Sequence, residues 1–424
     1  MAGEKVLIVS DNLQGPTGFG VNAQGVAWSL ADEYDVHILG LQEVMDRKII
    51  LDIEGDPREV IQHRNYPRER ELYDFGRRSL PVLLDNLKPD ILITVNDIQM
   101  VEHVPSVLCP NSITLKVADL PAKKILDDAT IQMHLEGELL KFREKYPRDV
   151  KWIQYAPQDG EPPMPFWKQI YMTADKVIAM SKYGQYVFKQ YFNMDVDYIW
   201  HGVDSAIFKP AEKPESLQDK FVVGDLNRNQ PRKQPARLIE AFAKFAKDKD
   251  DVLLHLQMDW NDVFGYPIGY LVNLYGIGDK IIQPFQVGMP RKQIPQIYNM
   301  WDISVNPTAG EGFGLTTIEA AACGKPTVIT DYTTSQELIM DGEPSPRGIL
   351  VPYVTLFWER FNVAAVQRAL IDIDKLVEAL EFYYQNRDIM EEHGRNAREW
   401  AVKNVALRKL QHKWKAVVKE VLNS

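Results

Sequence analysis

Cysteine is scarce in this sequence of 424 residues, which contains only Cys109 and Cys323. Two cysteines cannot build a disulfide framework, so a small disulfide-stapled secreted fold is excluded and a reducing compartment is expected. Long hydrophobic runs are also missing, because no stretch approaches ~18 consecutive apolar residues, and the first residues lack a basic and then apolar leader. We therefore expect no signal peptide, no membrane-spanning helix and a cytoplasmic location, while peripheral membrane contact stays open.

An excess of positive charge is absent as well. The formal net charge is −10, which argues against a general nucleic-acid-binding protein. The length is too great for one ordinary core and predicts two domains of roughly 200 residues each. A polar tract with two prolines, residues 211–220, has the composition of a linker between them.

Short apolar runs alternate with helical patterns throughout the chain. This alternation predicts an α/β protein with two doubly wound, mainly parallel sheets, in which ligands meet the carboxyl ends of the strands. Strands are expected at 6–10, 36–39, 91–95, 114–117, 152–155, 176–180 and 198–200 in the first half, and at 221–226, 252–256, 280–282, 303–306, 327–330 and 348–351 in the second.

A glycine-rich loop with two glutamates separates the strand at 303–306 from an alanine-rich helical segment. Strand, tight loop and helix together form a cradle in which the backbone N–H groups of residues 312–315 can hold an anion. Glu311 lies in the loop, whereas Glu319 falls in the apolar stripe of the helix and therefore needs a partner. The pair suits a ligand with phosphate and hydroxyl groups; a plain glycine turn with an ion-paired glutamate is the alternative.

Four cations follow the strand at 221–226 with no acidic residue before Glu240. They precede a predicted helix, whose N-terminus favours phosphate, although a solvated basic loop is the alternative. The four residues are Arg228, Arg232, Lys233 and Arg237.

The first half of the chain has its own candidate residues. Gly18 and Gly20 follow the first strand, but their spacing is not that of a dinucleotide-binding loop, and a simple tight turn is equally compatible. Asp97 and Asp159 lie after later strands, where an aspartate more often makes local turn or capping bonds.

The frame EGFGLTTIEAAACGKPTVIT, with Glu311-x7-Glu319, resembles the signature of retaining glycosyltransferases of family 4. The resemblance implies the GT-B fold, with two Rossmann-like domains facing a cleft. It assigns residues 1–212 to the acceptor side, 213–400 to the donor side and 401–424 to a helix that returns to the first domain. The implied reaction moves a hexose-type sugar from a UDP- or GDP-sugar to a glycan, lipid or other hydroxyl acceptor.

The same resemblance gives roles to the candidate residues. Arg228 and Lys233 match a Gly-Arg-Leu-x-x-x-Lys-Gly element, and with the amides of 312–315 they would neutralise the leaving diphosphate. Glu319 would bind ribose hydroxyls, and Glu311 the transferred sugar. The donor-binding positions that complete this set are Gly312, Phe313, Gly314, Leu315, Gly18, Gly20 and Phe285.

The sequence departs from the family pattern at three places, of which the first is that Asn227 and Gln234 stand where the element with Arg228 and Lys233 has its flanking glycines. Gln158 and Asp159 stand where many members have a histidine, so the general base is open and Asp159 is a catalytic candidate. His201 replaces an asparagine before Gly202. Phe285 would border the nucleobase, although a core phenylalanine is commoner. Neither a metal nor a cofactor beyond the donor is implied.

Two other functional classes stay open. A nucleotide-sugar epimerase or hydrolase would share the cleft but turn over its donor without an acceptor, and a non-catalytic nucleotide-sugar binding protein would turn over nothing. The arginine- and aromatic-rich stretch 64–78 could contact an anionic acceptor or membrane, but its interleaved acids favour a solvated face. The sugar, the base and the acceptor are not identified by the sequence.

Overall fold

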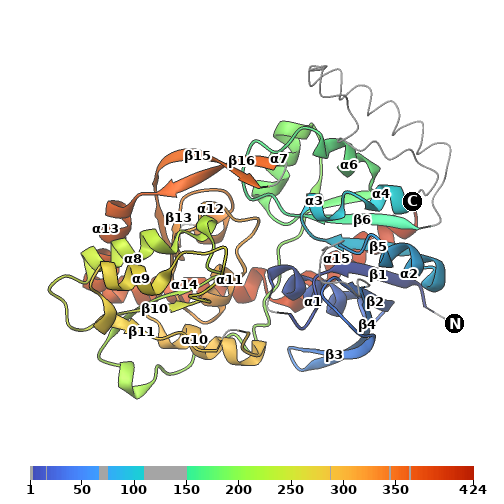
Figure 1. Cartoon of the computed structure of the whole chain (residues 1–424). Helices are drawn as coiled ribbons and strands as arrows, with labels where there is room; N and C mark the ends of the chain where they lie inside the picture. Colours follow the sequence, from blue (N-terminus) through green and yellow to red (C-terminus); the bar gives the residue numbers. More distant parts are fainter. Residues whose placement is uncertain are drawn as a thin grey trace, which may run out of the picture.

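The computed structural model shows two sheets of parallel character, each covered by helices. The chain crosses once from the first to the second, and α14 (Arg387–Asn404) and α15 (Leu407–Leu422) lead back (Figure 1). It describes residues 3–15, 17–65, 75–108, 150–286, 288–342, 345–361 and 364–424. Cys109, the strand expected at 114–117 and most of the stretch 64–78 lie outside these residues.

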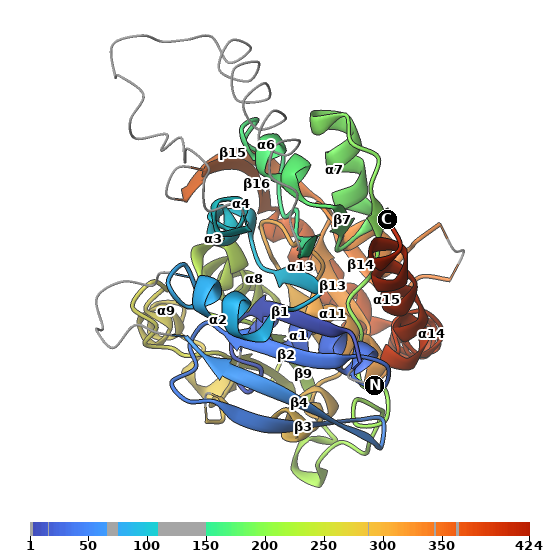
Figure 2. The same cartoon turned by 90° about the vertical axis from the view of Figure 1, so that its right-hand side faces the viewer.

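The first sheet has the order β3-β4-β2-β1-β5-β6-β7-β8 and is parallel except for the edge strand β3 (Figure 2). Its central strands are buried on both faces, as apolar runs in a helix-covered parallel sheet should be. The strands are β1 (Lys5–Ser10), β2 (Asp35–Gly40), β3 (Arg47–Ile53), β4 (Asp56–Arg64), β5 (Ile91–Val95), β6 (Lys151–Ala156), β7 (Lys176–Ala179) and β8 (Asp197–Tyr198).

Local sequence explains where the helices of this half begin. The Thr17 hydroxyl accepts the N–H of Gly20 at the start of α1, and the Ser181 hydroxyl accepts that of Gly184 at the start of α7. The helices are α1 (Gly18–Leu30), α2 (Ser79–Leu87), α3 (Ile98–Val101), α4 (Val104–Leu108), α6 (Trp167–Thr173) and α7 (Lys182–Phe192).

The second sheet is entirely parallel, with the order β11-β10-β9-β12-β13-β14. The strand order reverses between β9 and β12, and this is the point where a doubly wound sheet opens a ligand crevice. The strands are β9 (Phe221–Leu226), β10 (Val252–Gln257), β11 (Ile281–Ile282), β12 (Ile303–Asn306), β13 (Thr327–Thr330) and β14 (Gly348–Val351).

Helices cover the second sheet in the alternating manner that the sequence predicts. Asp372 caps α13 by accepting the N–H groups of Asp374 and Lys375, as its position before the amphipathic run indicates. The helices are α8 (Pro235–Phe245), α9 (Ile268–Leu274), α10 (Ile294–Met300), α11 (Leu315–Ala322), α12 (Ser335–Ile339), α13 (Ile373–Gln385) and α14 (Arg387–Asn404).

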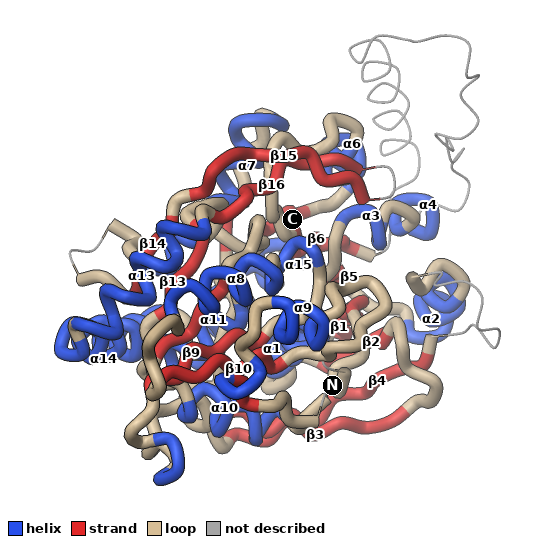
Figure 3. The backbone as a smooth tube through the Cα atoms, turned by 60° about the vertical axis from the view of Figure 1, so that its left-hand side comes forward, coloured by secondary structure: helices blue, strands red, loops and turns tan. Residues whose placement is uncertain are grey.

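Two antiparallel hairpins are not foreseen by the sequence analysis. One is β3–β4 at the edge of the first sheet. The other, β15 (Tyr353–Phe361) with β16 (Ala364–Ile371), leaves the second sheet after β14 and arches toward α6 and the first sheet (Figure 3).

The final helix, α15 (Leu407–Leu422), packs on α1 of the first sheet. Gly25 permits this approach, because a Cβ there would lie 2.8 Å from Cδ2 of Leu407. The Lys415 ammonium also pairs with Glu33 at 2.7 Å.

The division of the chain at residues 212 and 400 stays a prediction. Within the described ranges, no helix combines the length and apolarity needed to cross a membrane.

Candidate functional site

The signature loop leaves β12 at the switch point of the second sheet. Gly314 precedes α11 with φ of 118°, a conformation that favours glycine, and a Cβ there would lie 2.8 Å from Cδ1 of Leu338. Because α11 begins at Leu315, its first backbone hydrogen bonds are those of the Thr317 and Ile318 N–H groups to the Gly314 carbonyl, at 3.1 and 3.2 Å, and the N–H groups of Leu315 and Thr316 have no intrahelical acceptor. The local sequence therefore gives the tight turn between strand and helix that the glycine pattern predicts, while the binding of an anion there stays a prediction.

A buried ion pair lies beside this loop. The ammonium of Lys233 pairs with the carboxylate of Glu311, and Nη1 of Arg232 lies 3.5 Å from the other carboxylate oxygen. Burial alone would raise the pKa of Glu311, but Lys233 and Arg232 lower it to about 2. Burial also lowers the pKa of the Lys233 ammonium. The loop thus holds two cations and one ionised carboxylate at the crevice.

The turn that presents Lys233 is fixed by a neighbouring amide. The residues of η3 (Pro231–Lys233) are followed by Gln234, which adopts φ of 50°. Its side-chain amide donates to the carbonyls of Pro307 at 2.8 Å and Ala369 at 2.9 Å. These bonds tie the cationic turn to the signature loop and to β16, in a left-handed conformation where glycine is the usual residue.

The other predicted diphosphate ligand lies elsewhere. Arg228 is 58% exposed, and its Nε donates to Asp262 at 2.7 Å on the loop after β10. The structure therefore brings Lys233 but not Arg228 to Glu311. Arg232, which the sequence places in the cationic group but to which it gives no role, is the second cation beside the carboxylate.

Glu319 has the partners that its position in the apolar stripe requires. The Arg291 guanidinium lies 2.7 Å from one carboxylate oxygen, and the Tyr298 hydroxyl donates to the other at 2.8 Å. Glu319 is buried on α11, whereas Arg291 stands just before α10 (Ile294–Met300). The second carboxylate is thus held rigidly below the loop.

Two glycines bring the first half of the chain against this loop. A Cβ on Gly18 would lie 3.5 Å from Cδ1 of Leu315, and one on Gly312 would lie 2.9 Å from Cβ of Pro157. Glycine is required at position 20 by its own turn, because a Cβ there would lie 2.5 Å from the carbonyl oxygen of Asn12. Gly18 therefore lies within contact distance of Leu315 at the start of α11, while Gly20 permits a tight turn.

The two candidate aromatic residues differ in placement. Phe313 is buried, and its ring centroid lies 4.7 Å from that of His201, so its side chain is enclosed by the protein. Phe285 is 43% exposed and meets His255 edge-on at 5.5 Å between ring centroids. Of the two, Phe285 offers a free ring face to a ligand.

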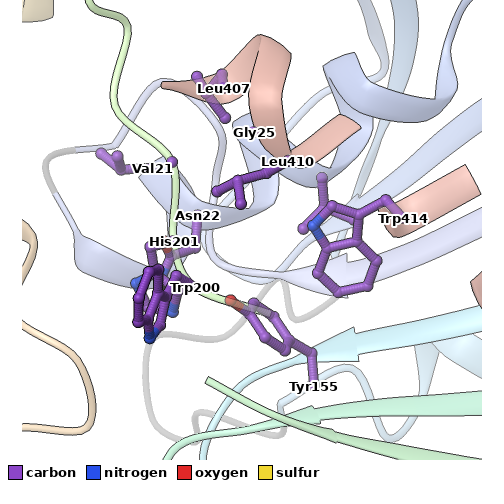
Figure 4. Close-up of a pocket in the computed structure, with 11 residues that line it drawn as sticks. Val21, Asn22, Gly25, Tyr155, Trp200, His201, Leu407, Leu410 and Trp414 are labelled. Carbon is purple, nitrogen blue, oxygen red and sulfur yellow. The ribbon is translucent and has the colours of Figure 1, made fainter. Parts of the chain in front are cut away.

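His201 lines a cavity of about 10 Å³, the space of one water, between α1, β6 and α15 (Figure 4). Its Nε2 is hydrogen-bonded to the Asn22 amide at 3.0 Å. Burial lowers the pKa of His201 to about 3. His201, which departs from the family pattern, is therefore a neutral, buried imidazole that joins the end of the first sheet to α1. This contact gives His201 a structural role.

Asp97 follows β5 and Asp159 follows β6, so both come from the first sheet, whereas the signature loop comes from the second. Nη1 and Nη2 of Arg368, on β16, lie 3.1 and 3.2 Å from the two Asp159 carboxylate oxygens, and Nε of Arg232 lies at 3.9 Å. Burial would raise the pKa of Asp159, but the two guanidiniums hold it below its usual range. Asp159 therefore faces the signature loop as an ionised group.

Asp97 is expected to make stability pH-dependent. Burial, then Asp159 and Asp11, raise its pKa to about 7 against Arg232 and Arg368. A folded-state pKa above the unfolded value gives stability that is complete at low pH and lost as pH rises toward 7, at ~1.4 kcal/mol per pKa unit. The difference in unfolding free energy between wild type and Asp97→Asn should fall from pH 4 to 7 and level off above 8. Parallel profiles would contradict this prediction.

Comparison with known proteins agrees with this geometry. Residues 208–400 match the family described as glycosyl transferases group 1. The matched segment contains Lys233, Glu311, Glu319 and Arg368. Asp159 and Gly18 lie before it.

Two curated relatives are similar over part of the chain. A D-inositol 3-phosphate glycosyltransferase of Segniliparus rotundus is 28% identical over 187 residues, which are 40% of this chain and 41% of the relative. A GDP-mannose-dependent alpha-(1-6)-phosphatidylinositol monomannoside mannosyltransferase of Mycolicibacterium smegmatis is 28% identical over 192 residues, 40% and 48% of the two chains. This chain thus spans less than half of each relative.

Solved structures match the whole chain. A sucrose-phosphate synthase from Thermosynechococcus elongatus superposes with a TM-score of 0.72 and 15% identity, covering 99% of both chains. Anabaena HepE, in complex with UDP and glucose, superposes with a TM-score of 0.66 and 15% identity, covering 98% of this chain and 100% of the other. The predicted GT-B fold is confirmed.

Proposed function

We propose that this protein is a retaining glycosyltransferase of the family 4 type, which moves a hexose-type sugar from a nucleotide-diphosphate sugar to a hydroxyl acceptor. The observation that carries the proposal is the largely buried Lys233–Glu311 pair in the loop next to the first amides of α11, those of Leu315 and Thr316. A cation and a helix N-terminus together suit a diphosphate leaving group. The carboxylate between them suits a sugar that gains positive charge as its bond to the diphosphate breaks.

The second carboxylate supports the same proposal. Glu319 lies eight residues beyond Glu311, as the fifth residue of α11, and is fixed by Arg291 and Tyr298. We assign it to the ribose hydroxyls and the exposed ring of Phe285 to the nucleobase. The matched relatives and structures include enzymes named for GDP-mannose and a complex with UDP, so both bases stay candidates for the donor.

The acceptor side is less defined. The relatives include proteins named for inositol 3-phosphate and phosphatidylinositol monomannoside, and their matches cover less than half of their length. We propose a hydroxyl acceptor that approaches Asp159. An epimerase or hydrolase, or a binding protein without turnover, would use the same crevice. Without an acceptor, an epimerase or hydrolase would turn over the donor at its full rate, the proposed transferase would only hydrolyse it slowly with water as acceptor, and a binding protein would not consume it.

Nucleotide binding at Glu319 is the first test. UDP, GDP, ADP, UDP-glucose, GDP-mannose and NAD would be compared by thermal shift, and a ligand at ~100 times its Kd should stabilise the protein by about 2.7 kcal/mol, or several degrees. Glu319→Gln should raise the apparent Kd of the nucleotide by at least about tenfold and so reduce the thermal shift, because a neutral amide accepts hydrogen bonds from ribose hydroxyls less strongly. Glu391→Gln, on the exposed face of α14, is the matched control.

The outcomes of this test are distinct. A shift with one nucleotide that Glu319→Gln weakens and Glu391→Gln retains would support the proposed donor site. A response to none of the nucleotides, or to NAD alone, would contradict the proposed function.

A further inference from the structure

The hairpin β15–β16 belongs to the second half of the chain but is joined to the first. The N–H of Gln367 donates to the carbonyl of Glu161 at 3.0 Å, and the Tyr332 hydroxyl donates to the Gln367 carbonyl, also at 3.0 Å. Gly160 leaves room for this contact, because a Cβ there would lie 2.8 Å from the Gln367 oxygen. One backbone bridge therefore links the loop after β6 to β16.

Arg368 adds a side-chain contact at the same place. Its side chain is only 8% exposed, and its two terminal nitrogens, Nη1 and Nη2, lie 3.1 and 3.2 Å from the two carboxylate oxygens of Asp159. We call this planar pair of nitrogens the fork of Arg368. Nη1 also donates to the backbone carbonyl of Asp159, and Nε donates to Glu359 at 2.8 Å. The guanidinium is thus held by its own hairpin and fixes the orientation of a carboxylate from the other domain.

Asp159 in turn touches the signature loop. Gly310 is required here, because a Cβ on it would lie 2.2 Å from the Asp159 carbonyl oxygen. Arg232 stands between Asp159, at 3.9 Å, and Glu311, at 3.5 Å. A continuous chain of alternating charges therefore crosses the crevice, from Arg368 through Asp159 and Arg232 to Glu311.

We propose that Arg368 is a positioning residue, which aims the Asp159 carboxylate toward the acceptor and joins the acceptor-side loop to the donor-side loop. This inference rests on the proposed function. The backbone bridge between Glu161 and Gln367 already connects the two domains, so the fork of Arg368 is needed for the direction of the carboxylate. The acceptor side of the site is then completed by a hairpin of the donor domain.

Loss of the fork should impair turnover but spare nucleotide binding. In Arg368→Gln, consumption of the responding donor, UDP-glucose or GDP-mannose, with water as acceptor should fall by about 10- to 100-fold, since a misplaced group is costly to catalysis. The Kd of UDP or GDP should stay within about twofold, because Arg368 contacts Asp159 and not the donor cradle. Arg368→Lys keeps the charge but loses the planar fork and should show most of the loss.

A double-mutant cycle and amide exchange distinguish positioning from general stability. Asp159→Asn with Arg368→Gln should lose no more activity than Asp159→Asn alone, because the two act as one unit. Amides of 158–161 should exchange about tenfold faster in Arg368→Gln, while those of β9 and β12 stay unchanged. Arg395→Gln, an exposed arginine on α14, is the matched control.

Additive losses in the cycle, or unchanged turnover and exchange in both Arg368 variants, would overturn the inference. If the wild type binds no nucleotide, the proposed function fails, whereas the exchange of 158–161 still shows whether Arg368 holds this loop.

Discussion

Alanine at position 233 is expected to lower the turnover number of donor consumption by at least about 100-fold, with a smaller rise in KM for the donor. Lys233 is the buried ammonium beside the cradle of α11, where negative charge would grow as the diphosphate leaves. An interaction that strengthens in the transition state affects kcat, and a single lost donor at such a place costs about 100- to 1000-fold.

Stability must be measured in the same variant. Removing one member of a buried ion pair costs about 3–5 kcal/mol when the other is left unpaired, although Arg232 remains 3.5 Å from Glu311. Rates would therefore be determined at saturating donor, below the unfolding temperature of the variant. Lys375→Ala, an exposed lysine on α13, is the matched control. An unchanged kcat at saturating donor would exclude the role proposed for Lys233.

The Arg228→Ala variant tests whether the family spacing or the observed geometry identifies the ligand of the diphosphate. The family spacing places Arg228 at the diphosphate, whereas in the structure it pairs with Asp262 away from Glu311. We expect a smaller effect than for Lys233→Ala. Spacing identifies which residues lie in a loop, but the direction of a long side chain depends on partners such as Asp262, which lies 34 residues further on.

The sequence predicts those parts of the fold that local patterns determine. Buried parallel strands appear as short apolar runs, so β1, β5, β9 and β12 are foreseen within one or two residues. Asp372 identifies the start of α13 because capping is a local interaction. A partner for Glu319 is predicted from burial alone, but its identity, Arg291 with Tyr298, requires the packing of α10 on α11.

The hairpin β15–β16 shows why the rest could not be predicted. Residues 353–358 of β15 are almost all apolar or aromatic, but most of the strand is exposed, so this run does not mark a strand of the buried sheet and does not indicate its partner. Its decisive contact, between Arg368 and Asp159, joins residues 209 positions apart. No periodicity in either segment indicates this pairing, so Asp159 can be predicted as a site residue from the sequence, whereas Arg368 cannot.

The Glu311→Gln substitution is expected to preserve or strengthen nucleotide binding while it lowers turnover. In the structure the Glu311 carboxylate neutralises Lys233 and lies near Arg232, so a diphosphate must compete with it for the same cations. Removing the negative charge should leave the Kd of the responding nucleotide, UDP or GDP, unchanged or lower it by up to about tenfold. Turnover should nevertheless fall by at least about 100-fold, because the carboxylate that would face the positively charged sugar is lost.

Calorimetric titration of the nucleotide and the rate of donor consumption would be measured on the same preparation. Glu319→Gln is the informative comparison, because it should weaken nucleotide binding, whereas Glu311→Gln should not. Weaker nucleotide binding in Glu311→Gln would place this carboxylate among the direct ligands of the nucleotide. Normal turnover would exclude it from the reaction. The different effects on nucleotide binding that we expect at the two glutamates follow from their surroundings, because Glu311 shares its cations with the diphosphate, whereas Glu319 is paired with Arg291 and Tyr298.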